Sequence, residues 1–573
     1  MKIITNNYFK VFVFFLIYIY IFIINNLFYT STYSADYQKY VVYLEYFYGF
    51  INYTNLDQGS LYYSLVAITL NFFSQFTSPT TLQFDISFSI QFTNNLLILF
   101  GLLGVYKLLN QLEIKFNNSI LILIIVNFFP PLQSLKLAMK PEILIFSLLP
   151  WLIFLLKNYL DDENHISLIV AIIPTVLIGL SKGTGFAITS LFLLYVFFEI
   201  LIKLNLKQFL GIFVIFVIFL TPIMYENYEV NNTHFLTRND ITENYKNRAS
   251  LDILLKNDRG KTFQTPFGEI DISTVFGVTL LDTFDDHFLL DWNKDVSLFK
   301  KHRKDLLIPY DGEQILSIDL NNREIQYNGI FKNSIINLRV YLGIILTFIF
   351  YILLFRFRHE KKINKKIVRS PILGIFILYF HSLGIPQEDF DPLVADTFKT
   401  FYYSPFLVIS FIFILSKLLD NINRQTIVIT IIFIFSTLHI NGFPKKDSSE
   451  YYGFLDELNQ NNVLCEINSL IIFDIKNSSK CTNKVDELCK FYTNKEEFEL
   501  ETSKFLIVDN VSYVKDEFQT VNQCINKINR VSQLETARLP IYNLSIFFMF
   551  ILINLYTVLR PNNFPSRIWL SNN

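Results

Sequence analysis

The chain has 573 residues, of which 52% are hydrophobic and 17% are charged, and its apolar residues fall in long uninterrupted blocks. Such blocks are typical of a polytopic helical membrane protein, because soluble helices and strands repeat their apolar residues at shorter periods. The formal net charge of -1 gives no basis for binding nucleic acid, so we expect no nucleic-acid partner.

About 12 stretches approach the roughly 17 to 25 apolar residues that a helix needs to cross a bilayer. These stretches lie at 8–29, 86–108, 119–135, 141–156, 166–182, 183–202, 209–225, 334–355, 370–385, 401–419, 426–442 and 541–559. They predict an all-α polytopic membrane bundle. The first stretch is too long for the apolar core of a cleaved signal peptide and lacks a small-residue cleavage site, so we expect it to remain as an anchor.

A basic connector between two of these stretches gives the strongest signal for orientation. It runs from Arg356 to Arg369 and carries Arg358, Lys361 and Lys362 among its cations. Because short cytoplasmic loops are enriched in Lys and Arg, the connector predicts that this side faces the cytoplasm. The membrane would be a bacterial inner membrane, or the endoplasmic reticulum membrane in a eukaryote.

Counting helices outward from the connector places the large polar segments on the opposite, extracytoplasmic side. Inside the outer loop 30–85, the stretches 38–51 and 61–76 are expected to be helices lying in the interface, with their tyrosines at headgroup depth. The chain then divides into an N-terminal membrane module at 1–225, a large outer loop at 226–333, a second membrane module at 334–442, an outer domain at 443–540, and a last span with a cytoplasmic tail at 541–573.

The outer domain 443–540 combines two strand-like runs, 469–473 and 504–508, with charged helical sequence, which predicts a small α/β domain. It also contains all four cysteines of the chain, Cys465, Cys481, Cys489 and Cys524. An even number of clustered cysteines fits an oxidising compartment, with three possible pairings. Four free thiols in a reducing domain are the alternative.

The order of these parts resembles the membrane glycosyltransferases of the C-type fold (GT-C), in particular the aminoarabinose-transferase and protein O-mannosyltransferase branch. Residues 36–40 (Asp-Tyr-Gln-Lys-Tyr) stand where that family has an acidic motif, and 56–63 where it often has Lys-Pro-Pro-Leu. Residues 179–183 (Gly-Leu-Ser-Lys-Gly) are similar to its Leu-Thr-Lys-Gly hairpin, and 399–405 to its Arg-Tyr-x-x-Pro motif. This chain departs from the pattern at Tyr37, which replaces the usual second acid, and it lacks the Lys-Pro-Pro element.

The resemblance implies an enzyme that moves a sugar from a polyprenyl-phosphate donor to a glycolipid, glycan or protein at the outer face, with inversion. A carboxylate at the acceptor hydroxyl acts as base, and cations stabilise charge on the leaving phosphate. Asp36 is the expected base. The expected substrate-binding residues are Lys182, Lys140, Lys399, Asp57 and Tyr403, the three lysines contacting the donor phosphate. No clear ligand set for a metal is present, although a divalent cation remains possible as cofactor.

Each of these residues also has an ordinary structural explanation. Asp36 can be a solvated residue at a helix end, and Lys182 can be an interfacial lysine that extends toward water. Lys140 can pair with Glu142 or simply precede a helix that begins at Pro141. Glu45 is comparable to Asp57. Asp282, Asp285, Asp286 and His287 have the density of a metal site, but an acidic solvated loop is more common.

Three other functions fit the same sequence. A transporter or flippase of lipid-linked saccharides would place ionisable groups in the middle of the membrane, whereas the polar residues of interest here lie near helix ends. A glycan polymerase or ligase of another fold would favour arginine-rich outer loops. A structural scaffold protein is the remaining alternative.

Overall fold

The structure, a computed structural model, describes a little over half of the chain. The described residues are 2–28, 40, 43–44, 46–49, 52–54, 58–74, 82–137, 139–232, 262–265, 268–271, 274–284, 333–357, 361–382, 400–421, 505–508, 511–514 and 534–559. Among these residues the chain is mainly helical, with two short β-hairpins.

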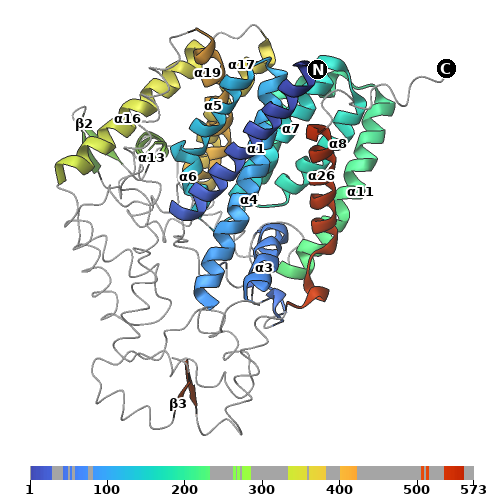
Figure 1. The fold of residues 1–573 in the computed structure, drawn as a ribbon, viewed down its shortest axis with the longest axis vertical. Coiled ribbons are helices and arrows are strands. Elements are labelled where there is room, and N and C mark those ends of the chain that lie inside the picture. The colour runs from blue at the N-terminus through green and yellow to red at the C-terminus, as the bar shows by residue number, and fades with distance from the viewer. Residues whose placement is uncertain are drawn as a thin grey trace.

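Long and short helices together form a bundle (Figure 1). Its members are α1 (Lys2–Phe28), α4 (Leu82–Gln111), α5 (Phe116–Asn127), α6 (Pro130–Leu137), α7 (Glu142–Asp162), α8 (His165–Gly179), α9 (Gly183–Leu191), the π-helical turn η2 (Phe192–Val196), α10 (Phe198–Lys203), α11 (Leu206–Asn231), α16 (Asn333–Arg356), α18 (Pro371–Ser382), α19 (Ser404–Asn421) and α26 (Ile541–Leu559). Every expected span falls on described helices except 426–442, which lies outside the described residues. The span expected at 119–135 is divided into α5 and α6.

Three helices of the described chain are long and apolar enough to cross a membrane: Phe88–Gln111 within α4, α7, and α11. The apolar part of α7 is 89% buried, whereas that of α11 is 6% buried. Helix α7 is therefore central, and α11 presents its apolar surface outward, as a helix does when it faces lipid. The remaining apolar helices are shorter, and the total number of spans stays a prediction.

One end of the bundle carries the short basic helix α17 (Lys362–Val368), which forms part of the predicted connector. Lys361 lies 3.1 Å from a carboxylate oxygen of Asp161 at the end of α7, and Lys362 lies 3.1 Å from Glu199 on α10. The first residues of α1 lie at this end as well (Figure 1). We call it the α17 end.

The opposite end is covered by α3 (Ser60–Ser74) and by the helical residues 40, 43–44 and 46–47, and we call it the α3 end (Figure 1). These residues are helical, as expected for the stretches 38–51 and 61–76. Their tyrosines are more enclosed than headgroup depth would imply: Tyr43 and Tyr63 are fully buried and stack at 3.9 Å between ring centroids. The aromatic residues therefore pack these helices onto the bundle.

The loop expected at 226–333 contributes to the bundle. Helix α11 continues past residue 225 to Asn231, and α13 (Val275–Asp282) packs against α16 and α18. After α13, the ring of Phe284 contacts the rings of Phe129 and Phe350. The apolar sequence of α13 explains this burial, but the helix is too short to be recognised as a span.

The two hairpins are antiparallel. The first pairs β1 (Thr262–Thr265) with β2 (Gly268–Asp271), and the second pairs β3 (Phe505–Val508) with β4 (Val511–Val514). Strand β3 confirms the strand expected at 504–508. The strand expected at 469–473 and all four cysteines lie outside the described residues, so the α/β domain stays a prediction.

Helix α26 is fixed to the bundle by α11. Both carboxylate oxygens of Glu226 accept hydrogen bonds near its N-terminus, from the backbone nitrogens of Tyr542 at 2.5 Å and Asn543 at 2.8 Å. An acidic side chain is favourable there because the first turn of a helix has unpaired N–H groups and a positive dipole end. The interaction places the start of α26 at the α3 end.

Candidate functional site

Two of the sequence motifs meet at the α3 end through their backbones. Gln58 and Lys182 form an isolated antiparallel β-bridge, and the backbone nitrogen of Gly59 donates a hydrogen bond to the Ser181 carbonyl at 2.7 Å. The hydroxyl of Tyr43 donates to the Gln58 carbonyl at 2.7 Å. Backbone hydrogen bonds thus join the segment before α3 to the hairpin between α8 and α9.

Two asparagines of α11 strengthen this junction. Asn227 Oδ1 accepts from the backbone nitrogen of Ser60 at 3.0 Å and from its hydroxyl at 2.8 Å. Asn231 Nδ2 donates to the Gln58 carbonyl at 2.5 Å, and Asn231 Oδ1 accepts from the hydroxyl of Thr54. Both asparagines are buried, so each hydrogen bond satisfies a group that would otherwise be costly to enclose.

The close approach at this junction yields a first prediction. A Cβ atom on Gly59 would lie 2.2 Å from the Leu180 carbonyl oxygen, a backbone atom that has little freedom to move. We expect Gly59→Ala to separate the segment from the hairpin and to destabilise the protein by about 1–3 kcal/mol. Thermal unfolding of the purified protein in detergent measures this effect.

Gly183, on the hairpin that Gly59 approaches, provides the matched control, because a Cβ atom there would meet nothing within 4 Å. Gly183→Ala should leave unfolding unchanged or slightly raise stability, since alanine favours a helix more than glycine does. Equal losses for both variants would contradict the close approach at Gly59.

The side chain of Lys182 forms a buried ion pair. Its Nζ lies 2.6 Å from Oε1 of Glu142, the first residue of α7. The Glu142 side chain is 0% exposed and that of Lys182 is 11% exposed. Lys182 Nζ also lies 5.1 Å from the centroid of the Tyr402 ring, within the range of a cation–π contact. Lys182 thus links the hairpin to α7 and to the segment before α19.

Lys140 and Tyr403 lie at the same end. Lys140 Nζ is 5.8 Å from the centroid of the Tyr40 ring, and its side chain is largely buried. Helix α7 begins at Glu142, one residue after the start at Pro141 that the structural explanation of Lys140 expected. Tyr403 is fully buried; its hydroxyl donates to Thr279 of α13 at 3.4 Å, and its ring packs against Gly374 of α18.

The other predicted site residues lie outside the described residues. These are Asp36, Asp57 and Lys399, together with Glu45 and the acidic residues Asp285 and Asp286 and the neighbouring His287. Asp282 is the last residue of α13. Within the described part of the chain, no group of three or more His, Cys, Asp or Glu side chains is arranged to hold a metal ion.

Four buried polar atoms on the segments that meet at this junction have no hydrogen-bond partner in the described structure. They are Gln58 Oε1, Tyr63 OH, Glu142 Oε2 and Thr184 Oγ1. The backbone of Gln58 is paired with that of Lys182, and Glu142 forms the ion pair with Lys182. Thr184 lies two residues after Lys182 in the chain. Native proteins rarely leave such atoms unsatisfied, so we expect water or a ligand to satisfy them.

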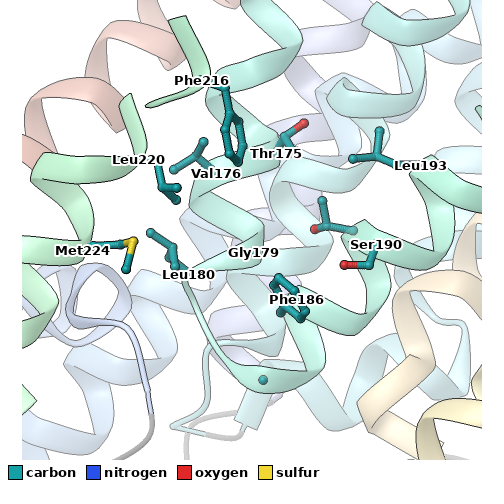
Figure 2. A pocket seen from close by; sticks show the side chains of 12 residues that line it. Thr175, Val176, Gly179, Leu180, Phe186, Ser190, Leu193, Phe216, Leu220 and Met224 are labelled. Carbon is teal, nitrogen blue, oxygen red and sulfur yellow. The ribbon is translucent and has the colours of Figure 1, made fainter. Parts of the chain in front are cut away.

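An apolar cavity of about 540 Å³ lies beside the Lys182 hairpin (Figure 2). It is bounded by α8, by α9 with η2, and by the outward-facing helix α11. Figure 2 shows Phe216, Leu220 and Met224 of α11 facing Val176 of α8 across it. Gly179 and Gly183, which flank the hairpin, also line it. The cavity has the size and apolar lining of a site for a hydrocarbon chain.

The sequence alone did not identify several of these residues. The pairing of Glu142 with Lys182 was missed because the two are 40 positions apart. Asn227 and Asn231 were missed because the span expected at 209–225 was ended at residue 225, although a spacing of four places both on one helix face. That spacing was the available signal.

Comparison with known proteins gives no assignment: no family model, no curated protein and no solved structure matches this chain.

Proposed function

We propose that this protein is an integral membrane glycosyltransferase that moves a sugar from a polyprenyl-phosphate donor to a glycolipid, glycan or protein hydroxyl at the extracytoplasmic face. The observation that carries the proposal is the junction at the α3 end, where residues of three motifs distant in sequence are in contact. Gln58 and Lys182 are bridged through their backbones, and Lys182 lies over the ring of Tyr402.

The chemistry of this junction suits a lipid-linked phosphate. In this proposal Lys140 and Lys182, which has 11% of its side chain exposed beside its ion-pair partner Glu142, stabilise the charge that collects on the leaving phosphate. The apolar cavity beside the hairpin supports a donor with a hydrocarbon chain. In this proposal Asp36 is the base, and Lys399 and Asp57 complete the substrate contacts. Tyr403, which was expected among them, is fully buried and packs against Gly374.

Transfer of a labelled sugar in reconstituted vesicles tests the proposal. Purified protein would be given polyprenyl-phosphate sugars and a hydroxyl acceptor extracted from the source membrane, and labelled product would be separated by chromatography. Mass spectrometry of surface glycolipids with and without the gene would identify the acceptor. A protein that binds these donors but makes no glycosidic bond with any acceptor is not a transferase.

The proposed orientation is the second prediction. Because the basic helix α17 and the α3 end lie at opposite ends of the bundle, reporter fusions at Lys362 and at Gly49 should give opposite results. Lys362 should report the cytoplasm, and Gly49 and Gly268 the extracytoplasmic side. Cytoplasmic signal at Gly49 would place the whole α3 end on the wrong side for this function.

A transporter of lipid-linked saccharides is the second candidate, and one observation favours it. Lys136 on α6 is fully buried and donates to Asn25 Oδ1 at 2.9 Å and to the Asn127 carbonyl at 2.6 Å. A buried ionisable group among membrane helices is a feature of transport pathways.

Replacing this lysine separates the two candidates and is the third prediction. For a transferase, Lys136→Met should lower stability, because the amides of Asn25 and Asn127 lose a donor, while the folded fraction keeps its turnover per molecule. For a transporter, the folded variant should lose movement of a fluorescent lipid-linked saccharide across vesicles. Both measurements are normalised to folded protein by size-exclusion chromatography.

A further inference from the structure

The unpartnered atoms around Lys182 limit what can bind there. Glu142 Oε2 and Gln58 Oε1 are acceptors, whereas Tyr63 OH and Thr184 Oγ1 can donate or accept. A buried acceptor without a donor costs about 1–3 kcal/mol, and more when it carries charge. A molecule that binds Glu142 Oε2 and Gln58 Oε1 therefore has to present hydrogen-bond donors to them.

A metal ion is a poor partner for this cluster. The carboxylate of Glu142 is already neutralised by Lys182, whose ammonium lies 2.6 Å from Oε1 and would repel a second cation. A neutral hydroxyl group meets the requirement without adding charge. It can donate to a carboxylate or amide oxygen and accept from a tyrosine or threonine hydroxyl.

Several hydroxyls in one molecule fit better than a single one. The four atoms come from the segment before α3, from α3 itself, and from the first turns of α7 and α9. They are connected through Lys182 and through Tyr43, whose ring stacks on Tyr63 and whose hydroxyl bonds to Gln58. A sugar carries hydroxyls on several carbons and can meet groups from separate segments.

We propose that Glu142 is a substrate-binding residue whose Oε2 accepts a hydrogen bond from one hydroxyl of the sugar of a lipid-linked saccharide. Lys182 holds the carboxylate through Oε1, and Oε2 has no hydrogen-bond partner in the described structure. The inference rests on the proposed function, from which it takes the class of substrate. It concerns binding alone and does not require that a sugar be transferred.

Equilibrium binding to protein in lipid nanodiscs tests the inference. The probes are citronellyl-phosphate esters of glucose, galactose, mannose and arabinose, and, for the tightest of these, the series in which each sugar hydroxyl is removed in turn. Glu142→Gln keeps an acceptor for Lys182 but replaces one carboxylate oxygen by an NH₂ group, which cannot accept. Its affinity for the tightest probe should fall by roughly ten- to hundredfold.

The deoxy series identifies the hydroxyl. One deoxy probe should bind wild-type protein roughly ten- to hundredfold more weakly, and the same removal should change binding to Glu142→Gln by less than about threefold, because the contact is already lost. Asp162→Asn, at the exposed opposite end of α7, is the matched control and should bind every probe as the wild type does.

The outcomes separate the inference from the proposed function. Equal affinities of wild type and Glu142→Gln overturn the inference, as do additive losses in the deoxy series or failure of wild-type protein to bind any probe. If binding depends on Glu142 but no acceptor is ever glycosylated, the inference holds and the transferase function fails. If transfer occurs without this dependence, only the inference fails.

Discussion

Replacing Lys182 by methionine is expected to destabilise the protein by about 3–5 kcal/mol, because it leaves the fully buried carboxylate of Glu142 without its counter-ion. The opposite change, Glu142→Gln, should cost less. It leaves Lys182 beside the Tyr402 ring with 11% of its side chain exposed, and the glutamine can still accept a hydrogen bond from the ammonium. The two losses of stability differ because the carboxylate of Glu142 is fully buried, whereas the side chain of Lys182 is partly exposed.

The double variant Glu142→Gln/Lys182→Met should recover most of the loss, since no buried charge remains. Lys362→Met is the matched control: Lys362 pairs with Glu199 but its side chain is 77% exposed, so its loss should cost less than about 1 kcal/mol. Unfolding in mixed micelles with increasing SDS measures all four variants. A double variant no more stable than Lys182→Met would show that the ion pair is not what stabilises the junction.

Apolar stretches in the sequence predicted the helices well because burial in lipid or in a bundle requires a minimum apolar length. Helix α7 has such a stretch and is the most buried candidate span. Helix α13 was missed for the same reason: its sequence Val-Phe-Gly-Val-Thr-Leu-Leu-Asp is apolar but spans eight residues, so it was included in a polar loop. The length of an apolar stretch identifies membrane spans, but it does not identify short helices that pack between them.

Motif spacing located the Lys182 hairpin, which the structure places between α8 and α9. It did not give the partner of Lys182. Lys140 was considered as a neighbour for Glu142 because the two are close in sequence, whereas the structure pairs Glu142 with Lys182 across two helices. Contacts of this kind depend on how helices pack, and a single sequence does not contain that information. The roles proposed for Asp36, Asp57 and Lys399 rest on the sequence alone.

The base is the part of the proposed mechanism with the largest expected effect. If Asp36 removes the proton from the acceptor hydroxyl, Asp36→Asn keeps the shape of the side chain but not its basicity. Sugar transfer in reconstituted vesicles should then fall by roughly 10²- to 10⁴-fold, while the variant inserts and folds as the wild type does. Donor binding should be nearly unchanged, because the asparagine removes no group that contacts the phosphate.

This pattern distinguishes the base from the donor site. Lys182→Ala should weaken donor binding and also lower stability, because Glu142 loses its counter-ion, so its activity has to be expressed per folded molecule. Asp36→Asn needs no such correction if it folds normally, and Asp162→Asn at the other end of α7 supplies the control with normal turnover. A transporter would form no glycosidic bond in any of these proteins. Near-normal transfer by Asp36→Asn would remove Asp36 from the mechanism, and the proton of the acceptor hydroxyl would then have to leave through another base.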